Sequence, residues 1–325
     1  MRALVTGGTG FVGSAVVRRL LAEGIEVVCL VRPTSDLRNL EGLEVLLLEG
    51  DLLDRVSLRR ALAGCQQVYH VAAYYSTRPQ EAELMFQVNV QGTRNLLEEA
   101  LAQGVERIVH TSTIGTIGRP LEKRLPTEED IFCDWERASP YVRSKLEAEN
   151  LALEMARQGA PIVVVNPCAP VGPRDIKPSS TGQRILDYLR GKEPSFLPGG
   201  INFVAVEDVA WGHLLAARRG RFGERYILGN SRGNLTREGF YALMERVSGV
   251  RPPGPRGVRK LWQRAKALGR GFLLKAKEEP SAPSYRPEAL TADPSRAIRE
   301  LGLPQMPLEV AFRQAVEWFR RHGYV

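Results

Sequence analysis

A tyrosine and a lysine stand four positions apart, as Tyr141 and Lys145. On a helix, positions i and i+4 share a face, so the phenol and the ammonium would project together. A free tyrosine has a pKa of about 10 and is a poor acid–base group near neutrality. A neighbouring cation lowers that pKa, so we expect Tyr141 to act as a general acid–base with Lys145 as its partner.

A glycine-rich run occupies residues 6–13, with the sequence Thr-Gly-Gly-Thr-Gly-Phe-Val-Gly. It follows an apolar run and opens an amphipathic one, which is the context that a dinucleotide-binding turn requires. Glycines there let the main chain approach a pyrophosphate, which then lies at a helix N-terminus. The residues expected to bind the dinucleotide are Gly7, Gly10, Phe11, Val12 and Gly13.

The second apolar run ends in Arg32, and Arg38 follows six residues later. Dinucleotide sites that take NADP place an arginine near this point, whereas sites that take NAD place an acid. A guanidinium matches the geometry of a phosphate. Asp36 remains available as an acid of the NAD type, so the sequence favours NADP and leaves NAD as the alternative.

Three further groups follow strand-like runs. Asp51 and Leu52 come after the third run, where a carboxylate is able to accept from an adenine amino group. Ala72 and Ala73 follow the fourth run and are small enough for a flat cofactor to pass closely. Hydroxyls at residues 111–113 end the fifth run and are able to bind a substrate oxygen.

The elements that would position these residues alternate along the first half of the chain. Apolar runs that predict strands lie at residues 3–6, 26–31, 43–48, 67–71, 107–111 and 161–166. Amphipathic stretches that predict helices lie at residues 10–23, 55–63, 81–103 and 141–158. Short apolar strands alternating with helices indicate an α/β fold with a doubly wound parallel sheet.

The second half is less regular, with prolines and glycines between its elements. Strands are expected at residues 202–206 and 225–228, and helices at residues 208–219, 236–248 and 308–321. We expect a dinucleotide-binding domain at residues 1–170, to which segments of about 200–230 return. Residues 171–325 are expected to form a smaller, interleaved α/β substrate lobe.

Composition excludes several classes of protein. The 325 residues carry a net charge of +8, but nine basic residues and no acid lie between Arg251 and Lys277. The remainder has 36 basic and 37 acidic residues, so a nucleic-acid-binding face is not expected. No long apolar run or signal peptide is found, which predicts a cytoplasmic protein. The cysteines and histidines are scattered, which predicts neither a disulfide nor a metal site.

These motifs together identify the chain as a member of the extended short-chain dehydrogenases/reductases, with a resemblance that runs from residue 1 to the C-terminus. This resemblance implies an NAD(P)-binding Rossmann fold. The residues that carry it are the glycine-rich run 6–13, Asp51-Leu52, His70-Val71-Ala72-Ala73, Asn89-Val90-Gln91-Gly92-Thr93, Thr111-Ser112-Thr113, Pro140-Tyr141 and Lys145.

The resemblance implies a role for each matching residue. Tyr141 would be the general acid–base, and Lys145 would lower its pKa and bind the nicotinamide ribose. Thr113 would hold the substrate oxygen, Asn89 would kink the fourth helix and support the proton path, and Pro167 would lie at the cofactor. Ile114-Gly115 stand where sugar 4,6-dehydratases carry an acid pair, so that activity is not expected.

Two branches of the family are similar to this chain: dihydroflavonol 4-reductase-like enzymes and hopanoid-associated sugar epimerases. We expect an NADP(H)-dependent carbonyl reductase or alcohol dehydrogenase, because an epimerase recycles a bound cofactor and gains nothing from an NADP pool. The alternative is an NDP-sugar epimerase, with Arg184, Arg225 and Arg232 as candidate diphosphate ligands. A third hypothesis is an NADP-sensing regulator without turnover. Many relatives pair two helices into dimers, so a homodimer is expected.

The basic segment offers one more hypothesis. Within residues 258–277, apolar residues recur at helical spacing while the basic residues fall elsewhere around the helix. Such a helix packs on the substrate lobe or makes weak, salt-sensitive contact with an anionic membrane surface. Base rates favour the packed helix.

Overall fold

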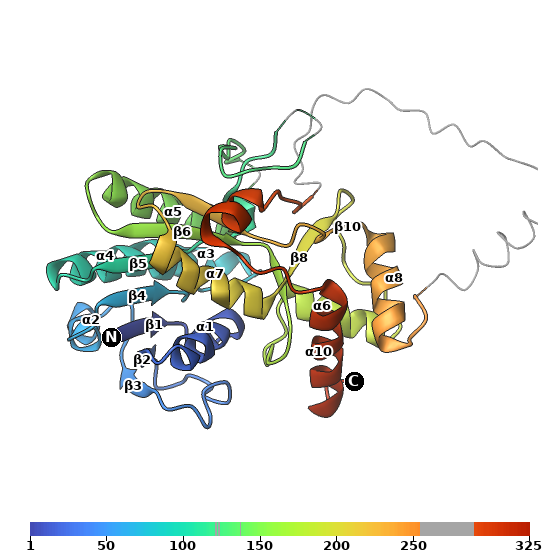
Figure 1. Cartoon of the computed structure of the whole chain (residues 1–325), viewed down its shortest axis with the longest axis horizontal. Helices are drawn as coiled ribbons and strands as arrows, with labels where there is room; N and C mark the ends of the chain where they lie inside the picture. The colour runs from blue at the N-terminus through green and yellow to red at the C-terminus, as the bar shows by residue number, and fades with distance from the viewer. Residues whose placement is uncertain (121, 123, 137, 254–288) are drawn as a thin grey trace, which may run out of the picture.

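The protein is described here by a computed structural model that covers residues 1–120, 122, 124–136, 138–253 and 289–325. A seven-stranded parallel sheet forms its larger part, in the order β3-β2-β1-β4-β5-β6-β9 (Figure 1). The strands are β1 (Arg2–Thr6), β2 (Glu26–Val31), β3 (Leu46–Glu49), β4 (Gln67–His70), β5 (Arg107–Thr111), β6 (Ile162–Pro167) and β9 (Arg225–Leu228). This order confirms the predicted doubly wound sheet, because the strand order reverses on either side of β1.

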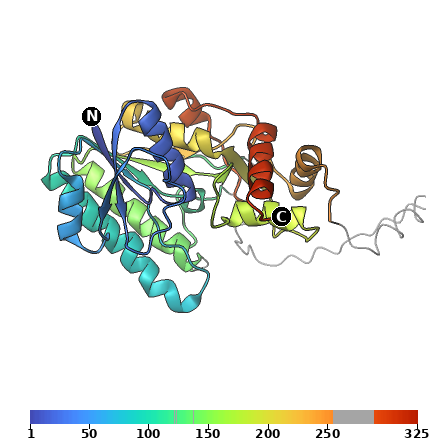
Figure 2. The ribbon, with the colours of Figure 1, turned by 90° about the horizontal axis from the view of Figure 1, so that it is seen from below.

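Helices cover both faces of the larger sheet (Figures 1 and 2). One face packs against α1 (Phe11–Ala22) and α7 (Val206–Arg219). The other packs against α2 (Arg55–Leu62), α4 (Gly92–Ala102) and α5 (Pro140–Arg157). Apolar residues of the inner strands β1, β4, β5 and β6 are buried on both sides, as a parallel sheet between two helical layers requires, whereas Leu46 and Leu47 of the edge strand β3 are exposed.

The second half of the chain contributes a smaller, separate sheet of three strands, in the order β10-β8-β7. Its strands are β7 (Ala169–Val171), β8 (Ile201–Ala205) and β10 (Asn234–Leu235). Helices α6 (Ser180–Leu189), α8 (Arg237–Ser248) and α10 (Leu308–Arg321) pack on it (Figure 1). Phe240 lies at the centre, with Phe203 and Phe312 at ring-centroid distances of 5.7 and 5.9 Å.

The helix expected at residues 81–103 is interrupted in the structure. It begins with the 3₁₀ turn η1 (Pro79–Glu81) and the short helix α3 (Ala82–Phe86). A π-helical segment, η2 (Gln87–Gln91), then joins α3 to α4. A π-helical turn inserts an extra residue into the helical ladder and is often found at functional sites.

The second half contains several elements that its sequence pattern does not predict. Helix α6 and strands β7 and β10 were not predicted, and the π-helical turn η4 (Ala297–Leu301) precedes α10. Among the described residues, no helix is long and apolar enough to cross a membrane. The proposed amphipathic helix at residues 258–277 lies outside the described residues.

Candidate active site

The glycine-rich turn connects β1 to α1 and touches the end of β4. Gly7 has a φ of +71°, and a Cβ there would lie 2.7 Å from the Cα of Ala72. A Cβ on Gly13 would lie 2.0 Å from the main-chain oxygen of Gly7. Gly10 is the N-cap of α1 and has no side chain to bond the free N–H groups of the first turn. The turn therefore leaves main-chain donors and the positive end of the helix for an anionic ligand.

A cleft of about 480 Å³ opens over this turn, at the carboxyl ends of the strands. The predicted turn residues line it: Gly7, Gly10, Phe11, Val12 and Gly13. Asp51 and Leu52 line it after β3, and Ala72 and Ala73 after β4. A dinucleotide fits this arrangement, since a glycine turn, a carboxylate and small residues lie along one continuous cleft.

The end of β2 supplies the cationic part of the cleft. Arg32 lines it, and so does Lys177, which comes from the segment after β7. Arg38 lies outside the lining residues and instead forms an ion pair with Asp36, with Nη2 2.7 Å from Oδ2. The contact of Arg38 with the cofactor stays a prediction, and in this structure its guanidinium is engaged by Asp36.

Sequence reasoning gave Lys177 no role. It is an exposed lysine between prolines, and only the tertiary fold brings its segment against the end of β2. Its charge contributes to keeping the pKa of Asp36 low, at about 2, after the larger effect of the Arg38 hydrogen bonds. The two cationic residues that line the cleft are thus Arg32 and Lys177, whereas the sequence indicated Arg32 and Arg38.

Pro167 is not among the residues that line the cleft, and its contact with the cofactor stays a prediction. It is buried at the end of β6, where it is in register with Leu228 of β9. Pro170 of β7 lines the cleft instead.

Tyr141 lies in the first turn of α5, half-buried and beside Tyr75. The two rings meet edge to face, with centroids 4.9 Å apart. Burial of Tyr141, with a smaller contribution from Tyr75, raises its pKa to about 12. Desolvation of the phenolate is thus the main influence on this pKa in the structure, which differs from the lowering by Lys145 that the sequence predicts.

Lys145 is 3% exposed, one turn further along the same face of α5. Its Nζ donates to the main-chain oxygen of Thr111, at the end of β5, over 2.6 Å. Burial lowers the pKa of Lys145 to about 8, and Glu149 acts in the opposite direction. The ammonium is thus held in the interior between a helix and a strand end.

Asn89 lies in the π-helical segment η2 and is 3% exposed. Its Oδ1 accepts from the main-chain nitrogen of Tyr74 over 2.7 Å, and its Nδ2 donates to the oxygen of Tyr74 over 2.9 Å. Nδ2 also lies 3.0 Å from Oγ of Ser144. This side chain therefore joins the segment after β4 to the helix that carries Tyr141.

Thr113 follows β5 and caps a 3₁₀ turn, with Oγ1 accepting from the nitrogen of Gly115 over 3.2 Å. Its main-chain oxygen lies 2.7 Å from Oγ1 of Thr116 and 3.2 Å from Nδ2 of Asn166. The side chain is half-buried. Thr113 is thus a hydroxyl-bearing residue whose main-chain oxygen faces the polar side chains of Thr116 and Asn166.

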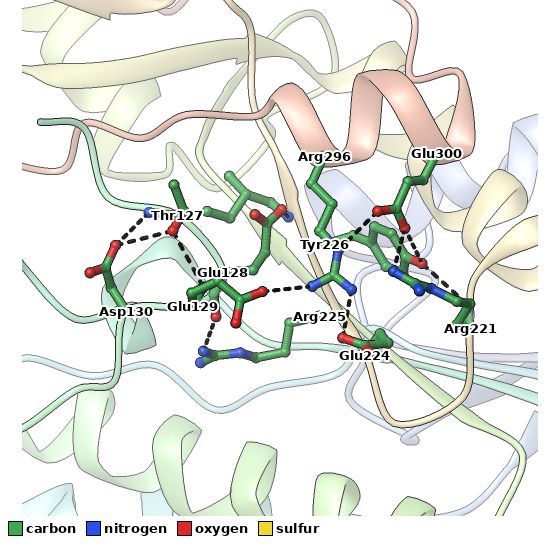
Figure 3. A network of polar contacts seen from close by, with 11 residues as sticks. Thr127, Glu128, Glu129, Asp130, Arg221, Glu224, Arg225, Tyr226, Arg296 and Glu300 are labelled. Atoms are coloured by element: carbon green, nitrogen blue, oxygen red, sulfur yellow. Dashed lines mark hydrogen bonds and ion pairs between the residues drawn. The ribbon is translucent and has the colours of Figure 1, made fainter.

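The loop between Thr113 and Tyr141 is fastened to the far edge of the sheet (Figure 3). The nitrogen of Ile227 in β9 donates to Oε1 of Glu128 over 2.8 Å, and Arg225 donates to the main-chain oxygen of Glu128. Arg296, just before η4, pairs with Glu224 over 2.6 Å and with Glu129 over 3.6 Å. These contacts tie the segment that connects two predicted catalytic residues to β9 and η4.

The three arginines considered as diphosphate ligands have different surroundings. Arg225 is paired with Glu149 over 3.0 Å, with a side chain 15% exposed, and Arg232 is exposed. Arg184 in α6 is half-buried, bonds the oxygen of Ser195 and lies within electrostatic range of Tyr75. Arg184 is therefore the member of this set nearest to the aromatic pair at Tyr141.

The described residues contain no cluster of side chains that could serve as metal ligands. No cluster of three or more histidine, cysteine, aspartate or glutamate residues there is arranged to hold a metal ion. All four cysteines have free thiols.

Comparison with known proteins agrees with the fold and the cleft. The sequence pattern described as "NAD dependent epimerase/dehydratase family" matches residues 3–229. The chain is 40% identical to a "Putative dihydroflavonol 4-reductase" from Synechocystis sp., over 99% of this chain and 95% of that protein. It is 37% identical to "Sterol demethylase protein B" from Methylococcus capsulatus, over the full length of both.

Comparison with solved structures places the chain in the same family of proteins. The chain superposes on a Thermus thermophilus UDP-glucose 4-epimerase in complex with NAD with a TM-score of 0.73 and 29% identity, covering 98% of this chain and 99% of the other. The family takes a nicotinamide dinucleotide, and its members include reductases and sugar-nucleotide epimerases. The protein described here belongs to the NAD dependent epimerase/dehydratase family, the extended short-chain dehydrogenases/reductases.

Proposed function

We propose that this protein is an NADP(H)-dependent carbonyl reductase of the dihydroflavonol 4-reductase-like type. The observation that carries the proposal is the composition of the cleft where β2 ends. Arg32 and Lys177 line the cleft there, while Asp36, the acid that an NAD site would use, is paired with Arg38. Two cations and an engaged carboxylate suit the 2′-phosphate of NADP better than a free ribose diol.

The chemistry is assigned to Tyr141, Thr113 and Lys145. A bound nicotinamide would supply the hydride, and Tyr141 would supply the proton to the carbonyl oxygen. With its pKa at about 12, Tyr141 keeps its proton at neutral pH, which is the state that a reduction needs. Thr113 would hold the substrate oxygen through its hydroxyl, and Lys145 would bind the nicotinamide ribose.

Asn89 would help to hold Tyr141 in position. By bonding both the main chain of Tyr74 and Ser144, it keeps the segment carrying Tyr75 against the helix carrying Tyr141. Tyr75 in turn contacts the ring of Tyr141. The proposed acid is therefore held by packing as well as by its own helix.

An NDP-sugar epimerase is the second candidate, and Arg184 is the observation in its favour. Its half-buried guanidinium near Tyr75 would suit an anionic group on a substrate. Arg225 contributes little to such a site, because Glu149 and the main chain of Glu128 already engage it.

The two candidates differ in what happens to the nucleotide. We expect bound nucleotide to exchange with free NADPH, and we expect NADPH to be consumed in proportion to carbonyl substrate, tested first with dihydroflavonols. An epimerase would retain its nucleotide through dialysis and interconvert UDP-sugars without net consumption of NADPH. That second outcome would refute the reductase, and exchange without any turnover would favour a regulator.

A further inference from the structure

Glu149 is a fully buried carboxylate that the proposed reaction does not use. It is 0% exposed and follows Lys145 by four residues and Tyr141 by eight on α5, so the three residues share one face of the helix. An ionised carboxylate in the interior is costly unless hydrogen bonds and opposite charges compensate for it.

The compensation comes from three other segments of the chain. Oγ1 of Thr116 lies 2.6 Å and Nδ2 of Asn166 lies 2.8 Å from Oε2 of Glu149. Nη1 of Arg225 lies 3.0 Å from Oε1. Both carboxylate oxygens are thus engaged, by donors from the turn after β5, from β6 and from β9.

Two of these donors also reach Thr113. Its main-chain oxygen lies 2.7 Å from Oγ1 of Thr116 and 3.2 Å from Nδ2 of Asn166. A hydroxyl has one proton, and a carboxylate is the stronger acceptor, so Thr116 donates to Glu149. The amide of Asn166, which also lies 3.0 Å from Oγ1 of Thr116, is then the donor left for the main-chain oxygen of Thr113. The orientation of both donors, and with it the main chain of Thr113, depends on the charge of Glu149.

The third donor connects Glu149 to the substrate loop. Arg225 also donates to the main-chain oxygen of Glu128, in the loop between Thr113 and Tyr141 (Figure 3). Glu149 therefore lies at the point where that loop, the turn that carries Thr113 and the helix that carries Lys145 meet.

Glu149 differs from the other titratable groups around Lys145 because it carries a negative charge. Lys145 faces His70 from β4, His110 from β5 and Glu149 from its own helix, while Arg225 faces Glu149 from β9. Burial keeps the pKa of His70 and of His110 well below the usual range, so both imidazoles are neutral. In the part of the chain that the structure describes, Glu149 is the negative charge acting on Lys145.

We propose that Glu149 is a positioning residue of this active site: its carboxylate sets the hydrogen bonds that hold the main chain of Thr113, and it supplies the negative charge that stabilises the Lys145 ammonium. Its effect on turnover rests on the reductase proposed above. Its effect on Lys145 is a property of the folded chain and does not depend on the reaction.

The test is an NMR titration of protein labelled with carbon-13 at the lysine Cε, without cofactor or substrate. Lys145→Met identifies the signal of Lys145. Glu149→Gln keeps the shape of the side chain and removes its charge, and we expect it to lower the pKa of Lys145 by about one unit or more. Glu149→Asp retains the charge and should leave this pKa near its original value.

Glu99→Gln is the matched control, since Glu99 is 4% exposed on α4 and pairs with Arg55 and Arg59 away from the site. It should reduce stability and leave the pKa of Lys145 unchanged. An unchanged pKa in Glu149→Gln, or equal shifts in both glutamine variants, would overturn the proposal.

Turnover gives the second measurement. In Glu149→Gln, kcat for NADPH-dependent reduction should fall by about tenfold, and its alkaline limb should move to lower pH. If Glu149→Gln does not fold, Thr116→Val removes the shared hydroxyl in an otherwise similar shape. That variant should lose about fivefold in kcat, because Glu149 loses one of its hydrogen-bond donors, and full activity there would contradict the positioning role of Glu149. Absence of any reductase activity in the parent protein would refute the proposed function and leave the titration result standing.

Discussion

Nζ of Lys145 donates a hydrogen bond to the main-chain oxygen of Thr111 over 2.6 Å, joining α5 to the end of β5 in the interior of the protein. Oγ1 of Thr111 in turn lies 2.9 Å from Nε2 of His213, on the opposite face of the sheet. The strand end next to Thr113 is thus held from both helical layers. An ammonium in this position is available to a ribose but costs folding free energy.

That cost predicts how stability depends on pH. The pKa of Lys145 is about 8 in the folded protein, below the ordinary value of 10.5, so the unfolded chain binds more protons between these pH values. Stability must therefore rise with pH across this window. We expect the wild type to gain up to about 3 kcal/mol relative to Lys145→Met between pH 7 and 10, measured by urea unfolding. Parallel pH dependences of the two proteins would contradict the lowered pKa.

Tyr141→Phe removes the proposed proton donor and keeps the ring. We expect kcat to fall by about 100-fold or more, with NADPH affinity nearly unchanged. Tyr75→Phe is the control, because it removes a neighbouring hydroxyl while keeping the edge-to-face contact. Steady-state kinetics and NADPH titrations measure both effects. Full activity of Tyr141→Phe would remove Tyr141 from the mechanism.

Arg32→Ala tests the choice of cofactor. The loss of a charge-assisted contact with the 2′-phosphate should weaken NADPH binding by about 1.5–3 kcal/mol and leave NADH binding nearly unchanged. Arg38→Ala should cost much less, since Arg38 is paired with Asp36 outside the cleft lining. Fluorescence titrations with both nucleotides provide the comparison. Similar losses of NADPH and NADH affinity in Arg32→Ala would refute the assignment.

Asn39 links the glycine turn to the segment after β7. It is 1% exposed, and its Nδ2 donates to the oxygen of Thr9 over 3.1 Å and to the oxygen of Arg174 over 3.2 Å. Asn39→Ala leaves the carbonyl groups of Thr9 and Arg174 without this donor, so we expect a loss of about 1 kcal/mol in stability and weaker NADPH binding. Thermal unfolding with and without NADPH measures both, with exposed Asn150→Ala as the control. Equal effects of the two alanine variants would show that this link is unimportant.

Local patterns predicted the elements that carry the cofactor turn. The bounds of β2 and β5 were predicted to the residue, because continuous apolar runs with polar ends mark buried parallel strands. The helix expected at 81–103 forms between Ala82 and Ala102, but its periodicity did not indicate the change to π-helical bonding at Gln87–Gln91. The π-helical segment η2 is accompanied by bonds from Asn89 to Tyr74 and Ser144, and contacts between distant residues leave no periodic signal.

The second half was harder to predict for similar reasons. Helix α6 begins after Ser179, whose Oγ accepts from the nitrogen of Gly182, but its polar and glycine-containing first turn resembles a loop. Its apolar residues Ile185 and Leu186 were the available signal. The contact of Lys177 with the cleft depends on how the two sheets are joined, which no short motif encodes.

Glu149 could have been noticed earlier, since it extends the spacing of Tyr141 and Lys145 by one more turn. What the sequence could not reveal is that donors from β6 and β9 converge on it. The domain boundary near residue 170, the homodimer and the cytoplasmic location stay predictions.

Hydride transfer is the most direct test of the proposed function. The purified protein should be incubated with a carbonyl substrate and NADPH deuterated at the transferred position, and the product analysed by mass spectrometry. We predict deuterium on the carbinol carbon of the product alcohol, in an amount equal to the NADP⁺ formed, and none with Tyr141→Phe on the same time scale. Interconversion of a sugar nucleotide with no deuterium in the product and no NADP⁺ formed would contradict the account.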